Sequence, residues 1–217
     1  MKHIMLVIWI LLGFQVGSML FYGVEGDKNR SFGEVERGID GSGQRNIGVE
    51  YKTWVRYPEH LAGPFTGGFG EESCHSCHFD YDVNMFDGTL ELKGMPEKVT
   101  AGNTYELEVL IGRPDLGAAG FQLTSRFEDG SQAGSFTLND AVILTPNTPG
   151  ETQYVQHAVK NISPKDGQKV WKFSWTAPES AGFGPIIVNL AGNAANGDES
   201  AFEDWILLRE YRVEVGD

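Results

Sequence analysis

Two cysteines and a histidine in one short segment have the types and the spacing for covalent cofactor attachment. The segment reads Cys74-His75-Ser76-Cys77-His78, which is the C-x-x-C-H pattern of c-type haem attachment. Two thiols at this spacing can each form a thioether with one vinyl group of a haem, and the imidazole that follows lies over the iron. We therefore expect one covalent haem c, attached at Cys74 and Cys77, with His78 as the proximal ligand.

Two other interpretations of these residues stay open. The chain has no further cysteine, and in an exported protein a Cys74–Cys77 disulfide would leave His78 without a role. A zinc ion could instead be held by Cys74, Cys77, His78 and one more histidine, although free thiolates rarely persist in an oxidising compartment.

The motif does not fix the sixth ligand of the iron. The candidates outside the N-terminal segment are His60, His157, Met85 and Met95. We discount His75 because it lies inside the attachment loop and points away from the distal face. A methionine ligand would raise the reduction potential, but methionine is more often a filler of the core. A strand-like run ends at His157, and a strand could hold its imidazole rigidly, so the residues alone leave the choice open.

Period-2 patterns predict that β-strands position this loop. Apolar or alternating runs occupy Thr89–Lys93, Tyr105–Val109, Phe121–Arg126, Ser135–Leu138, Ala141–Leu144, Tyr154–Val159, Val170–Trp175, Ile186–Leu190 and Trp205–Val215. Turn residues such as Asp129-Gly130 and Asp166-Gly167 separate them. Each strand has one apolar face to bury, so we expect an all-β fold, an antiparallel β-sandwich of two facing sheets. Its core should contain Trp171, Phe173 and Trp175.

The N-terminal part predicts export and a linker. Residues 4–22 are almost entirely apolar, and about 20 apolar residues suffice to cross a bilayer. We interpret residues 1–23 as a signal peptide or an uncleaved signal anchor, which would place the rest on the periplasmic or extracellular side. Residues 24–62 read as a polar, Gly-rich arm or linker, and residues 63–217 as the haem-binding domain. The glycines of residues 63–70 should let the backbone pass close to a flat cofactor.

Charge and motifs exclude several functions. The net charge of -13 and the pI of about 4.8 repel nucleic acid and anionic lipid, so a membrane contact is expected only through the N-terminal segment. Acidity favours basic partners. No Gly-x-Ser-x-Gly, His-Glu-x-x-His or phosphate-loop pattern occurs, so we expect an electron carrier and not an enzyme. The oligomeric state is not encoded in these patterns.

The chain from Gly63 onward resembles a bacterial family of exported single-haem domains similar to the reeler, or choice-of-anchor, β-sandwich. Five strings carry the resemblance, in this order: Gly70-Glu71-Glu72-Ser73-Cys74-His75-Ser76-Cys77-His78, Gly120-Phe121-Gln122-Leu123-Thr124, Tyr154-Val155-Gln156-His157, Phe173-Ser174-Trp175-Thr176-Ala177-Pro178 and Ala191-Gly192-Asn193-Ala194-Ala195-Asn196-Gly197-Asp198. The resemblance implies a reeler-like or Ig-like sandwich that carries the haem motif in an N-terminal loop. It also matches His157 to the family's Tyr-x-x-His position, which implies His157 as the distal ligand.

A haem with two protein ligands has no open position for a substrate, so the expected function is one-electron transfer to or from a redox partner protein. Two alternatives remain. The protein could be a haem-based ligand-binding or sensing module with a labile sixth position. It could also be a structural or adhesion sandwich that the cofactor, or a Cys74–Cys77 disulfide, stabilises.

Overall fold

The computed structural model describes residues 34–39, 45–50, 63–85, 88–145, 150, 152–180 and 184–216. The chain divides into two compact units, residues 1–54 and 55–217. In the first unit, the backbones of β1 (Glu34–Ile39) and β2 (Arg45–Glu50) form an antiparallel pair, in a stretch where the sequence shows no strand period.

The expected signal or anchor and His60 lie outside the described residues. Within the described part, no helix has the length and apolar character needed to cross a membrane.

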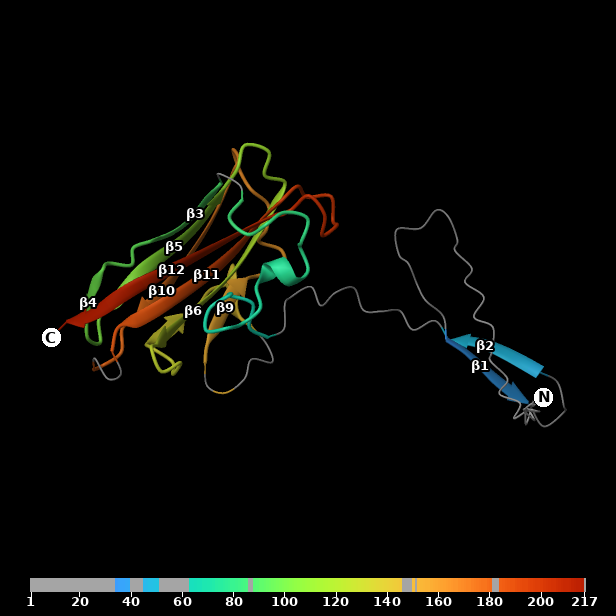
Figure 1. Cartoon of the computed structure of the whole chain (residues 1–217), viewed down its shortest axis with the longest axis horizontal. Helices are drawn as coiled ribbons and strands as arrows, with labels where there is room; N and C mark the ends of the chain where they lie inside the picture. The colour runs from blue at the N-terminus through green and yellow to red at the C-terminus, as the bar shows by residue number, and fades with distance from the viewer. Residues whose placement is uncertain are drawn as a thin grey trace, which may run out of the picture. The chain divides into compact units, whose positions relative to one another are not determined.

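Two β-sheets form the second unit (Figure 1). The four-stranded sheet has the order β3 (Thr89–Lys93), β5 (Thr104–Gly112), β10 (Gln168–Thr176) and β7 (Ser135–Thr137). The six-stranded sheet has the order β4 (Lys98–Thr100), β12 (Trp205–Gly216), β11 (Ile186–Ala195), β6 (Ala118–Phe127), β9 (Tyr154–His157) and β8 (Val142–Leu144). Neighbouring strands are antiparallel except β4 and β12, which run parallel. The all-β sandwich prediction is confirmed.

Alternating side chains of the two sheets fill the space between them. Trp171, Phe173 and Trp175 of β10 are buried, and they pack in one cluster with residues of β6 such as Phe121 and Leu123. The indole N–H groups also find acceptors: Trp171 donates to the Asn161 carbonyl at 2.8 Å, and Trp175 donates to Ser125 Oγ at 3.1 Å. Buried indoles need such partners, so these tryptophans belong to the core as predicted.

The outer face of the six-stranded sheet is also covered. Residues 63–85, which we call the covering segment, cross it, so β6 is buried on both faces. Gln122 shows the contact: its Nε2 donates to the Gly63 carbonyl at 3.1 Å, and its Oε1 accepts the Phe65 N–H at 2.5 Å. The predicted sandwich has one buried face on each sheet, so it does not include a layer on the outer face. This outer layer contains the cysteine motif.

Two glycines of the covering segment lie very close to the six-stranded sheet. The sequence predicts a close passage over a flat cofactor. In the structure, a Cβ added to Gly68 would lie 2.1 Å from Asn189 Oδ1, and one added to Gly67 would lie 2.9 Å from a methyl carbon of Leu208. The close neighbours are therefore side chains of β11 and β12, and the glycines let the segment lie flat on the sheet.

Candidate functional site

The cysteine motif folds as one helical turn. A 3₁₀ helix spans Cys74–Ser76, and the N-cap residue Ser73 accepts the His75 N–H with its hydroxyl at 3.2 Å. The Cys77 and His78 N–H groups both donate to the Cys74 carbonyl, at 3.3 and 3.1 Å. The turn therefore brings the two cysteines to its two ends, three residues apart.

The two thiols have different surroundings. Cys74 is buried in a small cluster with Ala191 of β11 and Ile206 of β12, whereas Cys77 is only partly buried. Burial raises the pKa of the Cys74 thiol to about 12. A thiol that resists ionisation is a poor metal ligand, while a neutral thioether needs no ionisation. The two cysteines are not joined by a disulfide in the structure.

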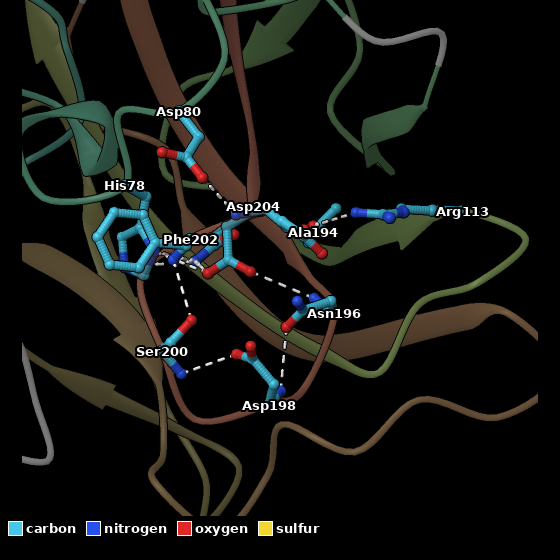
Figure 2. A network of polar contacts seen from close by, with 11 residues as sticks. His78, Asp80, Arg113, Ala194, Asn196, Asp198, Ser200, Phe202 and Asp204 are labelled. Carbon is cyan, nitrogen blue, oxygen red and sulfur yellow. Dashed lines mark hydrogen bonds and ion pairs between the residues drawn. The ribbon is translucent and has the colours of Figure 1, made fainter.

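A buried carboxylate orients the motif histidine (Figure 2). His78 Nδ1 lies 2.7 Å from Asp204 Oδ2, and the Asp204 side chain is 1% exposed. The same carboxylate accepts the Asn193 side-chain amide at 3.2 Å and the Asn196 N–H at 3.2 Å. A carboxylate acceptor favours the tautomer with the proton on Nδ1, which leaves the lone pair on Nε2. The orientation of the His78 ring is thus fixed, with the lone pair on Nε2.

His157 lies at the end of β9 and fills the space above a glycine. A Cβ added to Gly120 would lie 2.7 Å from His157 Cε1 and 3.2 Å from both ring nitrogens. The ring's Nδ1 is 3.1 Å from the Phe121 backbone nitrogen and 3.2 Å from the Phe121 carbonyl oxygen. The end of β9 therefore holds this imidazole against the backbone of Phe121, and the ring also lies near the rings of Phe121 and Trp171.

The register connects the two histidines. Gly120 of β6 pairs directly with Asn193 of β11, and Asn193 Nδ2 lies 3.4 Å from His78 Nε2. Directly paired residues project from the same face of a sheet, with Cβ positions about 5 Å apart. Gly120 therefore lies on the same face as Asn193, which is beside His78. The His157 ring meets Gly120 at the end of β9 and also packs against Phe121 and Trp171 of the core between the sheets.

The other candidate ligands are placed less favourably. Met95 packs against the main core between the sheets, while the cysteine motif lies on the outer face. Met85 is 67% exposed at the end of the covering segment. His75 has a buried Nε2 without a hydrogen-bond partner among the described residues. His157 lies beside Gly120 of β6, and Gly120 pairs with Asn193, which contacts His78.

Asp204 and Asn193 are the site residues that sequence reasoning missed. Asn193 lies within a string used for the resemblance, but nothing in its pattern indicated a role. Asp204 ends an acidic loop directly before β12, and its hydrogen bond to His78 joins residues 126 positions apart. The sequence itself carries no signal for Asp204. Its role becomes visible only when the fold brings this buried carboxylate to the histidine of the motif.

The residues present fit a haem c. A short helical turn carries the two cysteines, a buried carboxylate fixes the orientation of the His78 imidazole, and the His157 imidazole lies beside a glycine of the same sheet. Across the described ranges, no group of three or more His, Cys, Asp or Glu side chains has the arrangement of a metal centre.

Comparisons with known proteins give similarity in fold. No protein-family model matches the chain, and no curated protein matches it. Among solved structures, the reeler domain of human F-spondin matches with a TM-score of 0.42 and 17% identity, covering 61% of this chain and 93% of that chain. AvmM, which catalyses macrocyclization in alchivemycin A biosynthesis, matches with a TM-score of 0.38 and 14% identity, covering 63% and 95%. A type II cohesin domain from the cellulosome of Acetivibrio cellulolyticus gives 0.33 and 7%, covering 58% and 94%. These similarities assign neither a family nor a function to the chain.

Proposed function

We propose that this protein is an exported mono-haem c-type cytochrome on a reeler-like β-sandwich, and that it carries single electrons. Cys74 and Cys77 would hold the haem, His78 would be the proximal ligand, and His157 the distal ligand. The observation that carries the proposal is the contact between His78 Nδ1 and buried Asp204, at 2.7 Å, directly after a Cys-x-x-Cys turn. When bound, a haem c supplies a one-electron iron couple.

The chain's own residues have three tasks in this function. Asp204 holds the proton on Nδ1 of His78 and increases the basicity of the imidazole, as carboxylates do for metal-bound histidines. Asn193 fills the space beside this pair and donates to the same carboxylate. The apolar residues around Cys74, which include Ala191 and Ile206, exclude water from one attachment point.

Export and location belong to the same proposal. The apolar residues 4–22 would direct the chain across a membrane, and a membrane contact would be limited to this segment. Sequencing the N-terminus of mature protein from a bacterial host tests this directly. A start near residue 24 indicates a cleaved signal peptide, an intact Met1 in the membrane fraction indicates an anchor, and an intact Met1 in the cytoplasmic fraction rejects export.

The decisive experiment is production of the full chain with haem-maturation machinery, followed by a pyridine-haemochrome assay and peptide mass spectrometry. We expect one haem per chain, a haem-mass adduct on the peptide with Cys74 and Cys77, and a low-spin spectrum that carbon monoxide does not change. The variant Cys74→Ala with Cys77→Ala is the matched control and should carry no covalent haem. Wild-type protein without the adduct would reject the cytochrome assignment. Rapid carbon monoxide binding would favour the sensing alternative.

A further inference from the structure

Two loops beside His78 carry a concentrated negative charge. Residues 71–85 and 196–204 contain four acidic residues each and no Lys or Arg. The acidic residues are Glu71, Glu72, Asp80, Asp82, Asp198, Glu199, Glu203 and Asp204. The chain has a net charge of -13. The eight acidic residues of these two short stretches therefore equal more than half of this negative charge. We call residues 79–82 and 198–203 the acidic face.

The acidic face is one surface because its two loops are tied together. The Glu203 N–H donates to Asp80 Oδ2 at 2.9 Å (Figure 2). Next to Asp80, the Tyr81 ring stacks on Trp205 with centroids 4.0 Å apart and planes at 6°. The hydrogen bond between His78 and Asp204 also joins the residue before the first loop to the residue after the second. A surface held by such contacts is preorganised and loses little entropy when a partner binds.

Two aromatic rings stand in the middle of these charges. Phe79 is 60% exposed and Phe202 is 55% exposed, and their rings meet edge to face with centroids 6.1 Å apart. Phe79 directly follows His78 in the chain. Asp80, Asp82, Asp198, Glu199 and Glu203 around the rings are all exposed. The Ser200 backbone N–H and hydroxyl lower the pKa of the Asp198 carboxyl, which keeps this charge in mildly acidic solution. A small apolar centre within a charged rim is the usual composition of an interface.

We propose that the acidic face is the docking surface for a basic redox partner protein, with Phe79 and Phe202 as its apolar contact. The inference rests on the proposed function, because it places electron exchange at the loop that follows His78. Charge complementarity identifies the partner as a protein with a Lys- and Arg-rich patch around its own redox centre. A second copy of this chain would bring the same negative charge and be repelled.

The test measures how fast the reduced holoprotein is oxidised in a stopped-flow instrument. The probes are tris(1,10-phenanthroline)cobalt(III), a cation with flat apolar ligands, and hexacyanoferrate(III), an anion. In the variant Asp82→Lys with Glu199→Lys, we expect the rate with the cobalt complex at low ionic strength to fall about tenfold. The rate with hexacyanoferrate should rise, and both differences should shrink at high salt.

The matched control reverses two exposed charges far from the acidic face, in Glu97→Lys with Glu179→Lys. Glu97 precedes β4, which pairs with the last residues of β12, whereas the acidic face adjoins its first residue. The control changes the net charge equally and should leave the rate with the cobalt complex within about twofold of wild type. Equal slowing in both variants, or no slowing in either, would overturn the docking surface.

A second variant and a protein probe separate the remaining outcomes. Phe79→Ala should slow the cobalt reaction at low and high salt alike, because apolar contact is not screened. NMR titration of the holoprotein with mitochondrial cytochrome c, a basic haem protein, should shift resonances of residues 79–82 and 198–203. Shifts elsewhere, or a wild-type dimer that Phe79→Ala dissociates, would refute the docking surface. Because haem content is measured first, a protein without haem fails the proposed function and not the docking test.

Discussion

At the scale of single residues, the site depends on a carboxylate that water does not reach. Asp204 receives three donors, from His78, Asn193 and the Asn196 backbone. A buried charge is tolerated when it is paired and hydrogen-bonded in this way. The arrangement fixes the orientation of the His78 ring without any covalent constraint from the protein, and it makes Asp204 a positioning residue for the proposed proximal ligand.

Asp204→Asn tests this role with a side chain of the same shape. We expect the reduction potential of the holoprotein to rise, because the proximal imidazole loses the carboxylate that increases its basicity. The stability should fall by about 1–3 kcal/mol, the cost of a buried polar group that is left poorly paired. Voltammetry and urea unfolding measure the two effects. Asp198→Asn, an exposed change in the same loop, is the control, and an equal shift of the potential in both variants would contradict the role.

Gly120→Ala tests the distal position without touching a candidate ligand. The added methyl would lie 2.7 Å from His157 Cε1, so the imidazole must move. If His157 binds the iron, the spectrum should change from low spin toward the high-spin form expected for His157→Ala. Gly216→Ala, in the same sheet, meets the flexible end of Lys98 and should leave the spectrum unchanged. A low-spin spectrum in His157→Ala would reject this ligand.

At the scale of elements, an ion pair fastens the covering segment to the sheet. Glu71 Oε1 accepts from Arg126 Nη1 of β6 at 2.5 Å and also from the Tyr154 hydroxyl of β9. The Phe69 ring covers the guanidinium at 4.1 Å from its centroid. Burial and the hydrogen bond to Glu71 raise the pKa of the Tyr154 hydroxyl, so it stays a donor. These contacts fix the position of the covering segment on β6 and β9 at Glu71, three residues before Cys74.

Glu71→Gln should destabilise the protein by about 3–5 kcal/mol, because it leaves the Arg126 charge buried without its counter-charge. Urea unfolding monitored by tryptophan fluorescence measures the loss. Glu128→Gln breaks a comparable contact at the surface, where Arg212 and Glu128 are 57% and 50% exposed, and should cost less than about 1 kcal/mol. Similar losses in the two variants would show that the buried pair does not hold the segment.

At the scale of the whole molecule, the buried thiol links stability to pH in the haem-free form. The pKa of Cys74 is about 12 in the folded protein and near 9 in the unfolded chain, so the folded state retains the proton longer. Its contribution to stability is fully present below pH 9 and is lost as the pH rises toward 12.

In haem-free protein, the free energy of unfolding should therefore fall above pH 9 more steeply for wild type than for Cys74→Ala. The comparison removes the effects of lysines and tyrosines that titrate in the same range. Urea unfolding at pH 7, 9 and 10.5 gives the difference. Parallel pH profiles of the two proteins would argue against a buried thiol.

The sequence predicted the sandwich well because each strand carries its own local signal. Alternation placed every strand from β5 to β12 and β3 within a few residues. It missed β1 and β2, and it missed β4, whose Lys98-Val99-Thr100 has a single apolar residue. β4 is defined by its pairing with β12. Strands with one buried face were predictable because such burial leaves a period of 2. β6 and β11 are buried on both faces and were indicated by apolar runs.

The site was predicted only in part, and the reason is its construction. The motif was predictable because its residues, Cys74, Cys77 and His78, all lie within five positions of the sequence. Asp204 and Gly120 matter through contacts with residues far away in the chain, and an aspartate before a strand or a glycine within one has many ordinary explanations. The covering segment was missed as a layer because its irregular backbone has no period to detect.

Because Cys74 is buried, its sulfur can be modified only before folding is complete. Its sulfur lies beneath the covering segment against β11 and β12, two strands made more than a hundred residues later in the chain. On the proposed function, a maturation enzyme can reach this sulfur only before the last hairpin closes over it. The order of synthesis favours the enzyme, because the cysteines emerge from the export channel while the strands that will cover them are still to come.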